Sequence, residues 1–131
     1  MREPIKFTIS GTPITKKNSQ QIVMNPKTGR PFIIPSKSYK LYEKQAGWFI
    51  KDLQGLNISA PVNVKCLYYM PTKRRVDLLN LQEATDDILV KYGVLEDDNS
   101  NIVVSHDGSR VLHDKENPRV EITISFYDSS P

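Results

Sequence analysis

Acidic side chains are concentrated in one stretch of this chain. Seven of its 15 Asp and Glu residues lie between Asp77 and Asp98, a stretch whose single basic residue is Lys91. This segment has a charge of about −6, and the rest of the chain, with 17 basic and eight acidic residues, has about +9. Carboxylates bind divalent cations, and basic side chains bind phosphates. The pattern favours an enzyme that holds metal ions at its centre and a polyanion at its flanks over a simple DNA-binding protein or a calcium site.

The acidic stretch is predicted to begin as a helix over residues 77–92, which ends at Gly93. At 100° per residue, Asn80, Glu83 and Asp87 lie within about 60° of one another, because they are spaced i, i+3 and i+7. The adjoining face is the predicted core stripe, which consists of Leu81, Ala84, Thr85 and Ile88. Asp77 stands at the N-terminus of this helix, where the helix dipole favours a carboxylate.

A second acidic cluster, Glu96-Asp97-Asp98, follows the helix, and a returning loop could bring it beside one flank. Magnesium is usually held by one or two carboxylates together with substrate phosphate, and a pair of such ions can hydrolyse a phosphodiester. Asp77 and Asp98, with neighbouring acids, meet that requirement. Residue types alone leave other interpretations open: acids placed for the helix dipole, a turn at residues 97–99, and a solvated face at Asp86 and Asp87.

Basic residues flank the acidic stretch on several loops. Lys73-Arg74-Arg75 precedes the predicted helix, Lys16-Lys17 lies in a polar loop near the N-terminus, and Arg110 follows a predicted turn. These side chains could grip backbone phosphates, with an affinity that falls steeply with salt, or they could simply be exposed. Few side chains are placed to read bases, so we expect recognition to depend on the shape of the DNA more than on its sequence.

Size and composition restrict the class of protein. The chain of 131 residues is expected to form one domain over residues 1–131. Its one cysteine, Cys66, excludes an internal disulfide, and one cysteine with two histidines argues against a zinc site. No apolar run is long enough to span a membrane, and the N-terminus leads into a strand without a secretory segment. We therefore expect a cytoplasmic protein.

The predicted elements alternate between strands and helices. Strands are expected at residues 5–10, 21–24, 32–34, 61–70, 102–105, 110–112 and 120–127, and helices at residues 36–54 and 77–92. Ser36 is the expected N-cap of the first helix. His106-Asp107-Gly108 is expected to be a hairpin turn that joins the strands on either side of it. The order predicts an α+β (mixed α/β) domain, a small mixed sheet with two main helices packed on it.

Three segments together resemble the RusA-type Holliday-junction resolvases, a family often carried by phages and prophages. They are R-R-V-D-L-L-N-L-Q-E-A-T-D-D-I-L, G-V-L-E-D-D-N, and T-P-I-T-K-K-N-S near the N-terminus. The resemblance implies a homodimer that binds four-way DNA junctions and nicks two opposed strands, in recombination and repair. It also implies magnesium, with manganese as an alternative, held by aspartates from each subunit. It implies no small-molecule cofactor, and bacterial, phage or prophage origin.

The family pattern D-x-D-N, followed by a late D-D pair, transfers to this chain residue by residue. Asp77 matches the first aspartate, Asn80 the asparagine, and Asp97 and Asp98 the late pair. Two positions depart from the family: Leu79 replaces an aspartate, and Glu83 replaces a catalytic lysine. We hypothesise that Glu83, with Asp87, replaces the lost carboxylate, and that Lys115, Arg110 or Lys73 supplies the lost positive charge.

The resulting site prediction has three parts. The catalytic residues are Asp77, Asp98 and Glu83. The metal ligands are Asp77, Asp98, Asp97, Glu83 and Asp87. The DNA-binding residues are Lys16, Lys17, Asn18, Lys73, Arg74, Arg75, Asn80, Arg110 and Lys115. The alternative function is a catalytically impaired protein of the same fold that holds branched DNA without cutting it.

Overall fold

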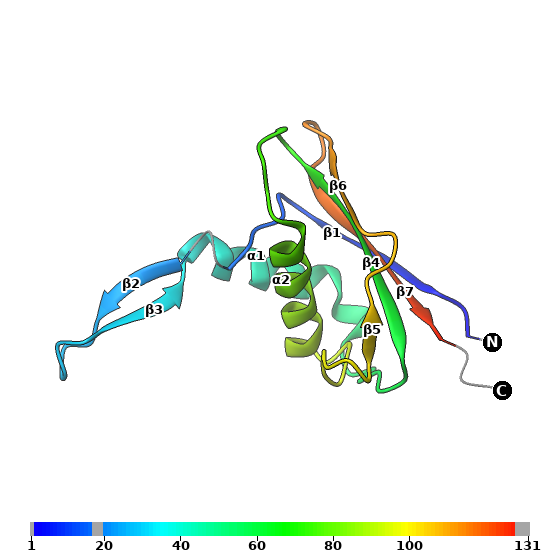
Figure 1. Ribbon diagram of the computed structural model, residues 1–131, viewed down its shortest axis with the longest axis horizontal. Coiled ribbons are helices and arrows are strands. Elements are labelled where there is room, and N and C mark those ends of the chain that lie inside the picture. Colours follow the sequence, from blue (N-terminus) through cyan, green and yellow to red (C-terminus); the bar gives the residue numbers. More distant parts are fainter. Residues whose placement is uncertain (1, 17–19, 128–131) are drawn as a thin grey trace.

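A computed structural model describes residues 2–16 and 20–127. Its centre is a mixed five-stranded sheet in the order β1-β7-β4-β5, with β6 also paired to β4 (Figure 1). Antiparallel pairing joins β1 to β7 and β7 to β4, whereas β5 and β6 both run parallel to β4. The bounds are β1 Ile5–Ser10, β4 Val62–Met70, β5 Val103–Ser105, β6 Arg110–His113 and β7 Arg119–Phe126.

The predicted hairpin around His106-Asp107-Gly108 is wrong. β5 and β6 do not pair with each other; they follow one another along the same edge of β4, in the same direction. The turn residues break this edge strand without reversing it. Gly108 has a φ of +87°, and a Cβ there would lie 3.2 Å from the Cδ atom of Lys65. The glycine therefore marks an irregularity in an edge strand, which a turn-based prediction cannot distinguish from a hairpin.

Two helices cover one face of this sheet. Helix α1, Lys37–Phe49, begins at the predicted N-cap Ser36, whose hydroxyl accepts from the Tyr39 backbone amide, and it is followed by a short 3-10 turn, Lys51–Leu53. Helix α2, Leu78–Lys91, buries its predicted core stripe. The facing strands contribute alternate residues, which in β4 are Val62, Val64, Cys66 and Tyr68. Buried residues recur every second position in the strands and about every 3.6 positions in α2, so the two sets face each other and form one shared core.

Both ends of α2 are fixed by identifiable caps. Asp77 is the N-cap, and its carboxylate accepts from the backbone amides of Leu79 and Asn80. At the other end, the Gly93 amide donates to Val90 and the Val94 amide donates to Leu89, a Schellman motif with Gly93 at a φ of +70°. The chain then turns back, and Leu95 forms a parallel bridge with Ile58. This return carries residues 96–101 past the C-terminal half of α2.

A separate hairpin projects away from the body. Strands β2, Gln20–Met24, and β3, Pro31–Pro35, form their own two-stranded sheet, which extends from the start of α1 on the side opposite the main sheet (Figure 1). Two packed layers and two main helices confirm the α+β prediction. No helix in the described ranges is long and apolar enough to cross a membrane.

Candidate functional site

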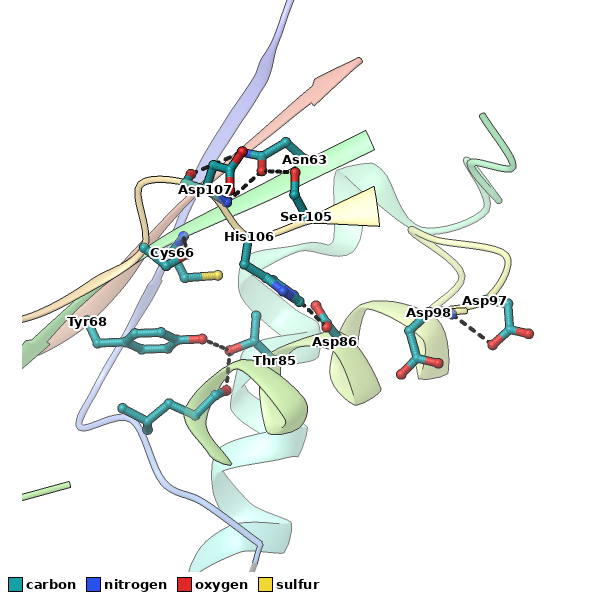
Figure 2. A network of polar contacts seen from close by, with 12 residues as sticks. Asn63, Cys66, Tyr68, Thr85, Asp86, Asp97, Asp98, Ser105, His106 and Asp107 are labelled. Atoms are coloured by element: carbon teal, nitrogen blue, oxygen red, sulfur yellow. Dashed lines mark hydrogen bonds and ion pairs between the residues drawn. The ribbon is translucent and has the colours of Figure 1, made fainter. Parts of the chain in front are cut away.

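Three carboxylates near the C-terminal half of α2 influence one another electrostatically. Asp86 and Asp87 lie on the helix, and Asp98 comes from the returning loop (Figure 2 shows Asp86 and Asp98). The pKa of Asp98 is raised, first by partial burial and then by the negative charges of Asp86, Asp87 and Asp97. Asp98 therefore lies within electrostatic reach of both helix acids. Mutual repulsion of this kind is relieved by binding a cation.

Asp86 is the buried member of this cluster and is only 6% exposed. Its Oδ2 atom lies 2.8 Å from Nε2 of His106, and its buried Oδ1 atom has no hydrogen-bond partner among the described residues. Burial raises the pKa of Asp86, although His106 opposes this shift. The hydrogen bond to Asp86 raises the pKa of His106. Both shifts have the same sign, so the folded pair holds its protons more tightly than the unfolded chain does.

His106 is positioned by the irregular edge of the sheet. The Asn63 side chain on β4 accepts from the Asp107 amide at 2.7 Å and donates to the Asp107 carbonyl at 3.1 Å. The Ser109 hydroxyl accepts from the Cys66 amide at 3.0 Å. These bonds hold both sides of the β5–β6 connection against β4. The break in the edge strand therefore directs the imidazole toward α2, as Figure 2 shows.

Asp77 stands at the opposite end of α2 from this cluster. It precedes the first residue of the helix, whereas Asp86 and Asp87 come nine and ten residues later. At 1.5 Å per residue the axial separation is about 13 Å. Asp77 is not among the charges that perturb Asp98. Within one chain, the structure therefore brings Asp98 together with Asp86 and Asp87 and leaves Asp77 apart from them.

The other predicted metal ligands, Glu83, Asp87 and Asp97, differ in exposure and in bonding partners. Glu83 is exposed on α2. The Asp87 carboxylate forms an ion pair with Lys16 Nζ at 2.9 Å. Asp97 is exposed and accepts from the Asp98 amide and the Asn99 side chain, and these bonds lower the pKa of its carboxyl. Asp97 therefore shapes the loop that carries Asp98.

The groups beside Asp98 suit a hard divalent cation, because they offer carboxylate oxygens as ligands. One of these oxygens, Oδ1 of Asp86, has no hydrogen-bond partner among the described residues. Among residues 2–16 and 20–127, however, no three His, Cys, Asp or Glu side chains converge closely enough to hold a metal ion. One subunit thus offers a partial ligand set, centred on Asp98.

A basic cleft lies at the other end of α2. It encloses about 570 Å³ and is lined by residues 12–15, residues 70–72, Arg74, Arg75 and Val76. Val76 directly precedes Asp77, so the cleft opens beside the N-terminus of the helix. Lys16 follows the cleft segment, and its pair with Asp87 links the basic and acidic ends. Arg74 and Arg75 are exposed there, as is the neighbouring Lys73.

The remaining predicted DNA contacts lie around the same end of the sheet or beyond the described residues. The Asp114 amide donates to Met70, and His113 Nε2 lies 3.2 Å from the Pro71 carbonyl. The turn that carries Lys115 is therefore beside the start of the basic loop. Arg110 is exposed at the start of β6, and Asn80 is half-buried in the first turn of α2. Lys17 and Asn18 lie outside the described residues.

Sequence reasoning missed Asp86 and His106. Asp86 was open to interpretation as part of a solvated face, and a lone histidine beside a turn is usually a surface residue. The helix pattern held a signal, because Gln82, Asp86 and Leu89 share one flank at i, i+4 and i+7, and all three are buried. Tyr68 is buried beside this helix, and its hydroxyl donates to Thr85.

Two comparisons with known proteins bear on this arrangement. The family model described as Endodeoxyribonuclease RusA matches residues 10–125, a range that includes the cleft segment, α2 and the late acidic loop. The chain is also similar to a protein of Aquifex aeolicus (strain VF5) named crossover junction endodeoxyribonuclease RusA. The two are 28% identical over 98 residues, which cover 74% of each protein.

Proposed function

Since this chain belongs to the RusA family of endodeoxyribonucleases, enzymes that hydrolyse phosphodiester bonds in DNA, we propose that it resolves Holliday junctions. It would bind a four-way junction as a homodimer and make paired nicks in opposed strands, with the help of a divalent cation such as Mg²⁺ or Mn²⁺. The observation that carries this proposal is the placement of a basic cleft and a carboxylate cluster at the two ends of one helix, α2.

The basic end would hold the DNA backbone. Arg74 and Arg75 line the cleft together with residues 12–15. Guanidinium groups bind phosphate in a bidentate manner, and such contacts fix position without reading sequence. The Lys16–Asp87 pair is partly exposed and so stabilises the fold only weakly, by about 0.2–1 kcal/mol. Lys16 can therefore exchange Asp87 for a phosphate, which would free that carboxylate when DNA binds.

The acidic end is incomplete in one subunit, and this supports a site shared by two. Asp77 and Asp98 are both proposed ligands, yet about 13 Å of helix separates Asp77 from the acids around Asp98. A second subunit related by a twofold axis perpendicular to α2 would place its α2 antiparallel to the first. Asp77 of each subunit would then approach Asp98 of the other, and two equivalent sites would form, matching the symmetry of an open junction.

Each residue of the proposed centre has a defined part. Asp98, Asp87 and Asp77 would bind the cation, with Asp97 holding the loop and Glu83 supplying a further carboxylate in place of the one absent at Leu79. When bound, such a cation supplies charge neutralisation at the phosphate and activation of water. Asp86, held by its hydrogen bond to His106, would place a buried negative charge behind Asp87 and Asp98. That charge would strengthen the attraction of these two carboxylates for cations.

Incubation with a labelled four-way junction and Mg²⁺ or Mn²⁺ tests the activity. Paired symmetric nicks are expected from the wild-type chain, and Asp98→Asn should lose nicking while it keeps junction binding. Asp52→Asn, which removes an exposed carboxylate from the turn after α1, is the matched control and should cut normally. Junction binding without any nicking would instead support the impaired-binder alternative, which the substitutions at Leu79 and Glu83 favour. Normal cutting by Asp98→Asn would refute the site.

A further inference from the structure

The hairpin of β2 and β3 has apolar residues on both faces. Side chains alternate along a strand and directly opposite residues share a face, so Ile22 and Met24 lie on one side, and Val23 and its cross-strand partner Phe32 on the other. Strands that are apolar on both faces are typical of strands covered on both sides. In the single chain this hairpin forms its own sheet and extends away from the body (Figure 1). A two-stranded hairpin is at best marginally stable alone.

Large apolar side chains remain exposed on this hairpin and on α1, which directly follows it. They are Ile22, Met24 and Phe32 on the hairpin and Leu41, Trp48 and Phe49 on α1. Their exposed fractions add up to about three and a half whole side chains. At about 200 Å² for each large side chain, this is about 700 Å² of apolar surface. A stable interface of standard size buries about 800 Å² on each partner.

We propose that the β2–β3 hairpin is an arm that embraces a second copy of this chain, and that α1 completes the contact through Trp48. The inference rests on the proposed homodimer and identifies its surface. The arm leaves the body on the side of the main sheet that α1 and α2 cover (Figure 1). A partner held there by two reciprocal arms would be placed against α2. The contact is isologous and closes after two subunits.

Branched DNA is the other candidate occupant, because Lys27 and Arg30 lie at the exposed tip of the arm. The argument for a protein partner is the chemistry of the strands behind the tip. Both faces there are hydrocarbon, and the backbone of DNA offers phosphates, which such faces cannot bind favourably. A duplex would engage the two basic residues and leave Ile22, Met24 and Phe32 exposed to water.

Trp48 provides a direct probe, because it is the single tryptophan of the chain and is 69% exposed in one subunit. Without DNA or metal, concentrated wild-type protein should sediment as a dimer with blue-shifted Trp48 emission, and dilution should shift that emission to the red. Ile22→Ser/Met24→Ser should raise the dimer dissociation constant at least about 100-fold and give red emission at every concentration. These side chains are exposed in the subunit, so its circular dichroism should not change.

Val104→Ser/Val111→Ser is the matched control, since these valines are exposed on the far edge strands β5 and β6, and it should dimerise normally. Trp48→Ala, followed by sedimentation alone, tests the same surface from α1 and should also weaken the dimer. A wild-type dimer that survives both arm and Trp48 substitutions overturns the proposal. Intact dimers that lose junction binding would assign the arm to DNA and also overturn it. Because no step uses cleavage, failure of the nuclease assay leaves this result unaffected.

Discussion

Replacing His106 by Phe should destabilise the protein through Asp86. The imidazole is the only described hydrogen-bond partner of the Asp86 carboxylate, whose other oxygen has none, so the variant would leave a buried charge wholly unpaired. A hydrogen bond to a charged group contributes about 1.5–3 kcal/mol, and removing one partner leaves the desolvation cost in place. We expect the free energy of unfolding at pH 6 to fall by about 2–3 kcal/mol.

The pH dependence has a definite sign. The pKa of His106 is raised above its ordinary value of 6.5, so its contribution is fully present below that pH and is lost as pH rises through the folded pKa. The difference between wild type and His106→Phe should therefore be largest near pH 6 and smaller at pH 9.

Urea unfolding followed by far-ultraviolet circular dichroism measures both effects. The double variant Asp86→Leu/His106→Phe is the informative control, because replacing both partners of a buried pair by apolar groups is often nearly neutral. It should recover most of the stability that the single variant loses. The reasoning is refuted if His106→Phe is as stable as wild type, or if the double variant is less stable than the single one.

Three further variants have defined outcomes. Arg74→Ala/Arg75→Ala should weaken junction binding and reduce the slope of log affinity against log salt by about 2, measured by fluorescence anisotropy, since two phosphate contacts are lost. Gly47→Ala should cost about 1–3 kcal/mol in urea unfolding, because its Cβ would lie 2.5 Å from Cζ of Tyr92. Leu79→Asp should leave stability within about 0.5 kcal/mol, because Leu79 is 72% exposed, and should raise Mn²⁺ affinity measured by electron paramagnetic resonance.

Local rules predicted most elements of the fold. Ser36 and Asp77 cap the two helices as their side chains dictate, and the glycine after α2 ends it in a Schellman motif. The edge of the sheet could not be predicted in this way. His106-Asp107-Gly108 carries the chemistry of a hairpin turn, but pairing is decided by which neighbour β5 and β6 bury against, and both pair with β4.

The sequence allowed us to predict which residue types form the candidate site, but not how they are arranged in space. Spacing along the chain identified the acids, but it could not show that Asp98 returns to Asp86 and Asp87 at the far end of α2 from Asp77. The burial of Asp86 depends on His106, which reaches it only because Asn63 holds the β5–β6 connection against β4. Such tertiary contacts leave no signature in local sequence.

Mixed dimers test most directly whether two subunits share each carboxylate site. Asp77→Asn and Asp98→Asn subunits would be co-expressed with different tags, and the heterodimer isolated by two affinity steps. If Asp77 of one subunit works with Asp98 of the other, the heterodimer contains one intact site and should nick one strand of a junction, while both homodimeric variants stay inactive. A heterodimer as inactive as its parents, though folded and bound to the junction, would contradict the shared site.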